Sequence, residues 1–337
     1  MKKPIKIWRF TDGKAGHEKQ SMAAINALSK KNNCEVFDID LPTKNSFFGA
    51  FFSGKLKTLK KLDKPSLIIG VGHQTHLYVL YAKKYYGGMS ILIMKPSLPT
   101  EWFDLCIIPE HDKAGGQKVY PDWLLNRGPK IFYTQGPLVD IKERKKNKTG
   151  KSMILIGGPS KNYEWNNSRI ISQIIDLIEQ NPKDKFMLVT SRRTPKSFMK
   201  YLRYGKLRAK KPEEALRDKD VTTSRNLDIY TSSSELHYAR SDPEWINERI
   251  SEARYIWVTN DSFSMIYESL SYGAQVGILF LDAYPDNRLD QATRQLFAGK
   301  RCNWDDERNY KKLTINHKNL NEAEDCAAFI LKKYEEK

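Results

Sequence analysis

The stretch VTNDSFSMIYESLSYGAQVGIL, residues 258–279, contains the transition that decides the fold. An apolar run at 255–259 ends in small polar residues, a helical pattern follows to Tyr272, and AQVGILFL then begins the next apolar run. Short apolar runs that alternate with helical periodicity are typical of parallel strands connected by helices. This stretch therefore predicts a β-α-β unit of an α/β protein.

The same alternation extends in both directions from this unit. IKIWRF at 5–10 is expected to be a strand, followed by the loop TDGKAGH and a helix from about 18 to 30. The chain restarts at MILIGG, where strands at 153–157 and 186–190 flank a helix at 168–179. Further strands are expected at CEVFDIDL, SLIIGVG, SILIMK, DLCIIPE and KIFYTQG, and further helices at 74–85, after Thr194–Pro195, after Asp242–Pro243 and in NEAEDCAAFILKKYEEK.

A charged segment separates the two halves of the pattern. Residues 140–151, DIKERKKNKTGK, contain no apolar periodicity, which indicates a solvated linker. We therefore expect a first Rossmann-like domain at 1–139, a linker at 140–151, a second Rossmann-like domain at 152–312 and a C-terminal helix at 313–337. The length of 337 residues agrees with two such α/β domains facing each other across a cleft.

Composition excludes several protein classes. The chain is 40% hydrophobic, and no stretch approaches the roughly 20 apolar residues that span a bilayer. The opening MKKPIKIWRF does not resemble a signal peptide, so a cytoplasmic protein is expected. The four cysteines form no CxxC pair, so they predict buried thiols and neither disulfides nor a zinc site.

The net charge of +17 falls mostly in residues 1–150 and favours an anionic partner. Nucleic acid, an acidic membrane surface and a phosphorylated substrate all fit, because charge alone does not distinguish them. The sequence contains no nucleic-acid reader motif, so nucleic acid is not expected as a partner. A generally lysine-rich composition explains the charge equally well.

The loops after the strands of the second half are candidates for an anion site, because ligands bind at the carboxyl edge of parallel sheets. The first helical turn near Ser262, Ser264 and Met265 offers free amides and hydroxyls to a phosphate, and Glu268 could accept the hydroxyls of a ribose. The alternative is that Asp261 or Ser262 only caps the helix and that Glu268 is solvated.

Two other loops of this half reach the same edge. Arg192 and Arg193 could clamp a diphosphate, or could form a surface ion pair. The loop IGGPSKNYEW at 156–165 allows close backbone approach through the glycines, including Gly158, and contributes Ser160. Tyr163 or Trp165 could enclose a base.

The first half offers groups for proton transfer and acceptor binding. TDGKAGHEKQ lacks both GxGxxG and the P-loop spacing. It does bring His17, Asp12 and Lys14 to the loop after the first strand, where a carboxylate-held imidazole could take a proton from a hydroxyl, although a lone His is often structural. GHQTH and PEHD add His73, Glu110 and His111, which are more typical of a polar acceptor pocket than of a metal site.

Residues 44–64 interleave aromatic and basic side chains. This pattern favours a segment that contacts an anionic membrane, and an amphipathic helix packed on the first domain is the alternative. The expected contact residues are Phe47, Phe48, Phe51, Phe52, Lys57, Lys60 and Lys61.

The ordered motifs TDGKAGHEKQ, PEHD, IGGPS, TSRRTP and VTNDSFSMIYE resemble the mitochondrial-fission family named for elongated mitochondria, over residues 5 to about 310. That family is similar to GT-B glycosyltransferases, in which two Rossmann-like domains enclose a nucleotide-sugar donor and the last helix crosses back to the first domain. The resemblance implies donor binding by the residues of the second half named above, and His17 as general base or its orienter.

The resemblance also has limits. The first loop lacks the multiple glycines of the transferase that adds the second sugar to peptidoglycan lipid, so the acceptor is not transferred from it. A DxD motif is absent, which agrees with metal-independent transfer.

The function expected from the sequence is transfer of a sugar from a nucleoside diphosphate to a lipid or cell-envelope glycan at the cytoplasmic membrane face, without a cofactor. A non-catalytic, membrane-associated scaffold that recruits a protein partner is the alternative.

Overall fold

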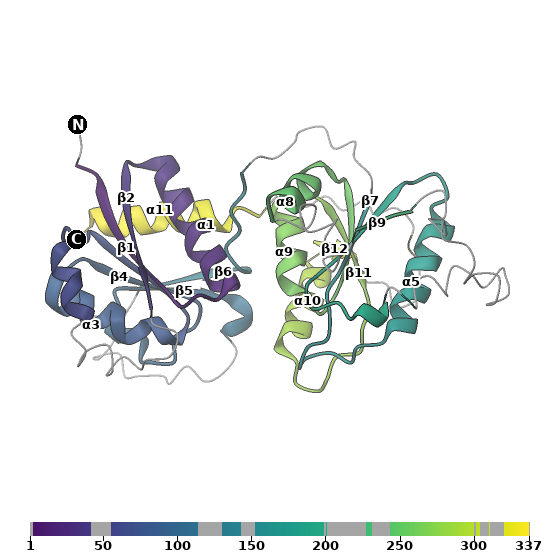
Figure 1. Ribbon diagram of the computed structural model, residues 1–337, viewed down its shortest axis with the longest axis horizontal. Coiled ribbons are helices and arrows are strands. Elements are labelled where there is room, and N and C mark those ends of the chain that lie inside the picture. Colours follow the sequence, from purple (N-terminus) through teal and green to yellow (C-terminus); the bar gives the residue numbers. More distant parts are fainter. Residues whose placement is uncertain are drawn as a thin grey trace. The chain divides into compact units, whose positions relative to one another are not determined.

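The computed structural model describes residues 3–41, 55–113, 130–142, 152–198, 200, 227–230, 243–299, 301–303, 310 and 320–336. The chain forms two compact units, Met1–Asp140 with Asn321–Lys337 and Ile141–Leu320 (Figure 1). In the described residues, each unit contains a parallel six-stranded sheet with helices packed against it. The predicted α/β class, with two Rossmann-like domains, is confirmed.

The first sheet has the strand order β2-β1-β3-β4-β5-β6. The order reverses between β1 and β3, and such a reversal is where ligands bind in open parallel sheets. The loops after β1 and β3 therefore meet at the switch point of this sheet. The strands are β1 (Ile5–Thr11), β2 (Cys34–Asp40), β3 (Leu67–Val71), β4 (Met89–Ile93), β5 (Leu105–Pro109) and β6 (Lys130–Thr134).

Successive side chains along the strands of the first sheet point to opposite faces, so the first unit has a hydrophobic core on each face of this sheet. Ile5 and Ile7 of β1 point to the face covered by α1 (Ala15–Lys31) and α11 (Glu322–Glu335), whereas Trp8 and Phe10 point to the other. That second face is covered by η1 (Lys55–Lys61) and α3 (His76–Tyr86).

The C-terminal helix completes the first unit. Figure 1 shows α11 beside α1, and its Ala323, Cys326, Ala327 and Ile330 are buried in the same core. The chain thus returns to its first unit after passing through the second, as the resemblance implied.

The second sheet has the order β12-β11-β10-β7-β8-β9, which reverses between β7 and β10. The loops after these two strands, 157–164 and 260–262, lie at the second switch point. The elements are β7 (Ser152–Ile156), α5 (Asn167–Gln180), β8 (Phe186–Thr190), β9 (Leu227–Tyr230), α8 (Pro243–Glu252), β10 (Tyr255–Thr259), α9 (Phe263–Ser271), β11 (Gln275–Leu279), α10 (Arg288–Ala298) and β12 (Cys302–Asn303).

Some of the predicted features lie wholly or partly outside the described residues. Phe47, Phe48, Phe51 and Phe52 lie outside the described residues, as does most of the predicted linker. Of the cysteines, Cys106, Cys302 and Cys326 are buried and Cys34 is half-buried. Among the described helices, none combines the length and the apolar character needed to cross a membrane.

Candidate functional site

The loop after β1 holds a carboxylate-imidazole pair. The Asp12 side chain is fully buried, and His17 Nδ1 lies 2.9 Å from its Oδ2 and 3.0 Å from its Oδ1. With Nδ1–H directed at Asp12, the other ring nitrogen, Nε2, is left as a proton acceptor. The arrangement provides an oriented imidazole base at the switch point of the first sheet.

Two further residues hold this pair in place. Lys14 Nζ lies 3.2 Å from Asp12 Oδ2. Burial alone would raise the pKa of Asp12, but hydrogen bonding from Lys14 and the charge of His17 outweigh it, so the pKa lies below its usual value. Gly72, after β3, has φ +81, and a Cβ there would lie 2.3 Å from His17 Cε1, so the imidazole packs directly on this backbone.

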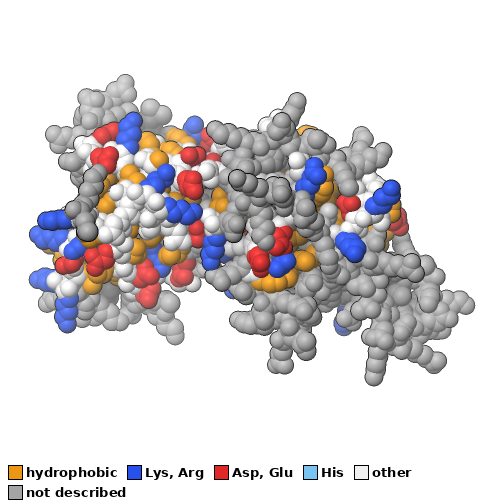
Figure 2. Space-filling model, turned by 90° about the horizontal axis from the view of Figure 1, so that it is seen from above, with side chains coloured by type: hydrophobic (Ala, Val, Ile, Leu, Met, Phe, Trp, Pro, Cys, Tyr) orange, Lys and Arg blue, Asp and Glu red, His pale blue; other side chains and the backbone are white. Residues whose placement is uncertain are grey.

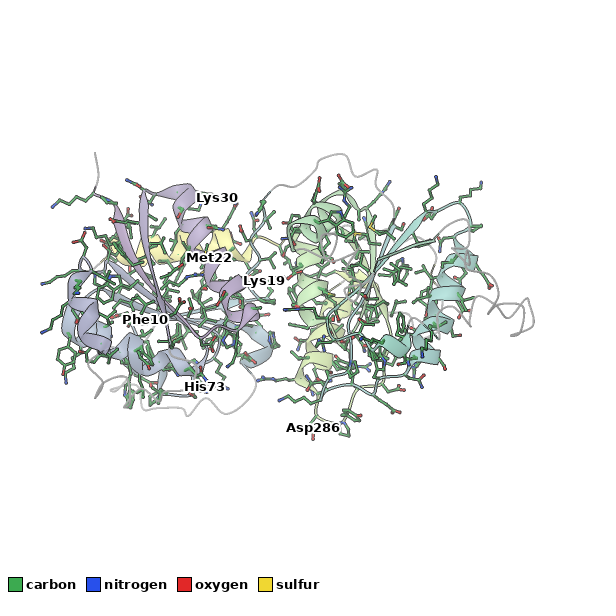
Figure 3. All side chains as sticks on the ribbon, viewed as in Figure 1. Phe10, Lys19, Met22, Lys30, His73 and Asp286 are labelled. Carbon is green, nitrogen blue, oxygen red and sulfur yellow. The ribbon has the colours of Figure 1, made fainter. Side chains whose placement is uncertain are left out.

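Of the predicted acceptor-side residues, Lys14 binds Asp12, and the other three lie in loops at the same edge of the sheet. His73 is exposed, at the lower edge of the first unit in Figure 3. Glu110 is exposed and His111 is half-buried, with its Nε2 3.9 Å from Asp112 Oδ1. The binding of an acceptor by these side chains stays a prediction.

His76 is a buried group that sequence reasoning left unassigned. It begins α3, is 2% exposed, and its Nδ1 lies 3.3 Å from Ser97 Oγ. Burial, with a smaller repulsion from His73, lowers the pKa of His76 to about 4. This imidazole is therefore neutral in the folded protein near neutral pH.

In the second unit, the loops after β7 and β10 are joined by hydrogen bonds. The Gly157 amide donates to Thr259 Oγ1 (2.8 Å) and the Gly158 amide donates to Asp261 Oδ2 (2.9 Å). A Cβ at Gly157 would lie 2.2 Å from Asp261 Oδ2. The close backbone approach predicted for the two glycines thus serves contacts within the protein.

Arg193, after β8, closes this cluster. Its Nη2 donates to Asp261 Oδ2 (3.0 Å) and to Ser262 Oγ (3.1 Å), and its Nη1 donates to the Gly158 carbonyl (3.0 Å). The side chain of Arg193 is 46% exposed, whereas that of Asp261 is fully buried. We call Gly158, Arg193, Asp261 and Ser262 the arginine cluster.

Asp261 is the buried acid of the arginine cluster. Burial raises the pKa of Asp261, and hydrogen bonds from Gly158, Thr259 and Arg193 only partly oppose this. Its Oδ1 is buried and has no hydrogen-bond partner within the described part of the chain. Asp261 does not act as a helix cap here, because its carboxylate is bound to the Gly158 amide and to Arg193.

The remaining predicted donor residues surround the start of α9. Ser262 is its N-cap and is buried, Ser264 is exposed, and Met265 and Glu268 are half-buried. The first amides of a helix have no partner within the helix, so this turn retains donors for an anion. The assignment of Ser264 and Met265 to a diphosphate, and of Glu268 to a ribose, stays a prediction.

Four further residues of the neighbouring loops were considered as ligand contacts. Arg192 is exposed, and the described contacts place only Arg193 in the cluster. Ser160 Oγ accepts from the Asn162 amide (3.3 Å) and so stabilises its own turn. Tyr163 is 2% exposed in the core of the second unit, so the interpretation that its ring encloses a base is wrong. Trp165 packs against Phe198, 6.2 Å between ring centroids.

Sequence reasoning found these loops but missed the partners within them. The pairing of Arg193 with Asp261 joins residues 68 positions apart, and the contact of His17 with Gly72 joins two loops. The only local signal of such contacts in the sequence is a glycine directly after a predicted strand. Gly157 and Gly158 follow one strand, and Gly72 follows another. Among the described residues, no group of three or more His, Cys, Asp or Glu side chains is placed to hold a metal ion.

The segment predicted to contact membranes is partly described. Leu56 and Leu59 of η1 are buried in the core of the first unit, and Lys60 and Lys61 are exposed. Lys57 lies in η1, but its side chain is outside the described set. Within η1, the packed amphipathic arrangement is the one observed.

Comparison with known sequences identifies the family. The family model described as Mitochondrial fission ELM1 matches residues 15–334. The uncharacterized protein RP120 of Rickettsia prowazekii (strain Madrid E) is 23% identical over 367 residues, which cover 97% of this chain and 98% of that protein. The similarity therefore extends over both units.

Comparison with solved structures concerns the fold. A protein assigned as UDP-N-acetylglucosamine 2-epimerase from Listeria monocytogenes is similar with a TM-score of 0.56 and 11% identity, over 99% of this chain and 98% of that one. The UDP-GlcNAc 2-epimerase from Neisseria meningitidis, bound to UDP-GlcNAc, is similar with a TM-score of 0.50 and 12% identity, over 98% and 100%. Because the family model covers nearly the whole chain, this protein belongs to the Mitochondrial fission ELM1 family, as its motifs predicted.

Proposed function

We propose that this protein is a glycosyltransferase that uses a nucleoside-diphosphate sugar. The second unit binds the diphosphate of the donor, and the first unit removes a proton from the acceptor hydroxyl. In the reaction, the acceptor oxygen bonds to the anomeric carbon, the bond from that carbon to the diphosphate oxygen breaks, and the hydroxyl proton passes to His17 Nε2. The products are the glycosylated acceptor and a nucleoside diphosphate.

The observation that carries the proposal is the arginine cluster at the start of α9. A half-exposed guanidinium, the buried Ser262 hydroxyl and the first-turn amides of α9 come together at the switch point of the second sheet. A diphosphate carries charge that this set of donors can bind, through both the guanidinium fork and the helix N-terminus. The same groups stabilise the charge that develops on the leaving diphosphate.

The pair Asp12 and His17 supports the second half of the reaction. Asp12 is held as a carboxylate, so it fixes the tautomer of His17 and stabilises the imidazolium that forms when the acceptor loses its proton. Lys14, which also binds Asp12, provides positive charge for an anionic acceptor or for the departing diphosphate.

The acceptor in this proposal is a lipid or cell-envelope glycan presented at the cytoplasmic membrane face. The positive charge of residues 1–150 and the interleaved Phe and Lys residues at 44–64 support an anionic surface as partner. Neither nucleic acid nor a resident cofactor has a role in it.

A second candidate is an epimerase acting on the sugar nucleotide itself. It is favoured by one observation: both solved structures described above carry that assignment in their names. An epimerase needs the same donor site but no acceptor, so the two candidates predict different products. The scaffold that the family name suggests needs neither.

The experiment that separates these functions is a binding screen followed by product analysis. Thermal shift of the purified chain against UDP, GDP, ADP and CMP sugars should raise the melting temperature with one nucleotide class. Incubation with the bound sugar nucleotide, with and without a membrane lipid extract, then identifies the products. Acceptor-dependent release of nucleoside diphosphate supports the transferase, and acceptor-independent formation of an isomeric sugar supports the epimerase. Failure of every nucleotide to bind contradicts both.

A further inference from the structure

The exposed surface of α3 includes large apolar and aromatic side chains. The helix reads HLYVLYAKKYY, and Tyr78, Val79 and Ala82 are buried in the core that it shares with η1, with Leu80 and Tyr81 half-buried against the same core. Its exposed positions carry Leu77, Lys84 and Tyr85, which we call the α3 face.

This composition is unusual for a helix at the surface of a chain with 29% charged residues. A surface helix normally presents charged and polar groups opposite its buried stripe, and a helix that is apolar on all sides is normally enclosed by protein or lipid. Yet Leu77 is 37% exposed and Tyr85 is 59% exposed. Two of the three exposed positions of α3 therefore carry a large apolar or aromatic side chain.

The aromatic side chains of the region form a connected layer. The rings of Tyr81 and Tyr85 lie 4.6 Å apart, and Tyr81 also contacts Tyr86 at 6.4 Å. At the last turn of α3, Lys83 Nζ donates to the carbonyl of Trp102, a residue of η3 (Thr100–Trp102) that is 51% exposed. Tyr and Trp favour the boundary between lipid and water, because each combines a large apolar ring with one polar group.

The charges around this surface are mainly positive. α3 carries Lys83 and Lys84 and no acidic residue. η1 packs on the same core, and Lys60 and Lys61, with Lys64 after it, are exposed. Figure 1 places α3 at the left end of the first unit, and Figure 2 shows Lys and Arg side chains gathered at that end.

The acidic groups of the region offset part of this charge, because they pair with Lys83 and Lys6, whereas Lys60, Lys61, Lys64 and Lys84 are exposed. Asp104 is paired with Lys83 at 3.2 Å, and Asp63 is paired with Lys6. Glu101, beside Trp102, is half-buried. Exposed lysines interspersed with amphipathic rings complement a bilayer that contains anionic lipid, because the rings enter the headgroup region while the ammonium groups meet phosphates.

We propose that the α3 face, together with Trp102, docks this protein onto an anionic lipid bilayer. The inference rests on described residues alone and does not depend on glycosyl transfer. A second copy of the chain is the rival occupant of this surface.

The experiment is co-sedimentation of the full chain with sucrose-loaded vesicles of pure phosphatidylcholine and of phosphatidylcholine with 30 mol% phosphatidylglycerol, a composition chosen at roughly the charge of a bacterial membrane. The wild type should partition onto the anionic vesicles and lose binding as salt rises. The double variant Tyr85→Ser with Trp102→Ser should bind at least about tenfold more weakly, because it removes two interfacial aromatic rings. Lys84→Glu should weaken binding by about fivefold or more, because it reverses a charge near the surface.

The matched control is Tyr284→Ser with Phe297→Ser, which removes aromatic side chains of similar exposure, 48% and 44%, from the second unit. It should bind vesicles like the wild type. Melting temperature and nucleotide binding of every variant establish that the fold and the donor site are intact, so failure of the proposed function is recognised separately.

The proposal is overturned if the wild type does not bind anionic vesicles, or if the α3 variants bind them as well as the control does. The second result would assign any membrane binding to another segment. A shift of the α3 double variant from dimer to monomer on size exclusion, with vesicle binding unchanged, would assign the face to a second copy of the chain and would equally overturn it.

Discussion

Arg192 and Arg193 are neighbours in the sequence but have different surroundings. Arg193 donates to Asp261, Ser262 and the Gly158 carbonyl, whereas Arg192 is exposed. Arg193→Gln should weaken binding of the favoured nucleoside diphosphate by about 10- to 100-fold, because a charge-assisted hydrogen bond contributes about 1.5–3 kcal/mol. Calorimetric titration measures this change.

Arg192→Gln is the matched control, since it removes the same charge one residue away. Its affinity should stay within about twofold of the wild type, because exposed charges contribute little. Equal losses in the two variants would mean that general charge, and not the arginine cluster, binds the nucleotide. The nucleoside monophosphate should discriminate less between wild type and Arg193→Gln than the diphosphate does.

His17 is predicted to act on the acceptor and not on the donor. His17→Gln should lower kcat of the transferase by about 100-fold or more, because general base catalysis contributes about 10²–10⁴. Donor affinity in calorimetry should be unchanged. His73→Gln, at an exposed position of the same edge, serves as comparison and should retain most of kcat. A His17 variant with full turnover would remove the proposed base.

His76 links stability to pH. Its pKa is about 4 in the folded protein, below its usual value of 6.5, so the unfolded chain binds more protons between these values. The lowered pKa of His76 therefore contributes to the free energy of unfolding in full above pH 6.5. This contribution decreases as the pH falls towards 4, and the loss is about 2 kcal/mol at pH 5. Urea unfolding at pH 7 and pH 5 measures the loss. In His76→Gln the difference between the two pH values should be smaller by that amount.

At the scale of elements, the turn after β7 depends on two glycines. A Cβ on Gly158 would lie 2.3 Å from the backbone carbonyl of Arg193, which cannot move without displacing the guanidinium. Gly158→Ala should therefore destabilise the second unit by about 1–3 kcal/mol and weaken nucleotide binding as well. Chemical denaturation and calorimetry measure the two effects.

Gly16 provides the comparison for this substitution. It lies in α1, and a Cβ there would have nothing within 4 Å. Gly16→Ala should be neutral or stabilise the protein by up to about 1 kcal/mol, because Ala favours a helix more than Gly does. If both alanine variants behave alike, the close packing of Gly158 on Arg193 is not important in solution.

The buried strands were predictable from the sequence because each is a short continuous apolar run. LIIGV at 67–71 and SMILI at 152–156 are enclosed on both faces, as expected for parallel sheets covered by helices. The edge strands of the second sheet were missed. β12 has two residues and β9 has four, and pairing with a neighbour defines such strands more than their own sequence does.

The sequence analysis did not predict helix α10, although the start of this helix is recognisable in the sequence. α10 begins after Asn287, whose side chain accepts hydrogen bonds from the amides of Leu289 and Asp290, and Leu289, Ala292 and Leu296 follow at helical spacing.

The candidate site was predictable only in part. Its loops could be located because they follow predicted strands. Which of the two arginines binds Asp261 could not be predicted, because this depends on packing between distant segments of the chain.

At the scale of the molecule, α11 belongs to the first unit although it follows the second in the chain. Ile330 is fully buried against the first sheet. Ile330→Ala should destabilise the first unit by about 2–5 kcal/mol. It should leave nucleotide binding by the second unit unchanged. Denaturant unfolding followed by intrinsic fluorescence, with calorimetric titration of the nucleotide, measures both.

Lys332→Ala is the surface comparison at an exposed position of the same helix, and it should change the free energy of unfolding by less than about 0.5 kcal/mol. Loss of nucleotide binding in Ile330→Ala would show that the two units do not behave as separate folding units.

The late position of α11 also sets an order of events during synthesis. While the ribosome translates residues 141–320, the nascent first unit lacks the helix that closes one face of its sheet. The second unit, continuous in the chain, can fold as it emerges, whereas the first can finish only after α11 has also been synthesised. Until then the apolar face of its sheet is uncovered and can aggregate with other nascent chains unless a chaperone binds it. Premature stop codons within α11 should therefore produce aggregated protein and not a shortened, active protein.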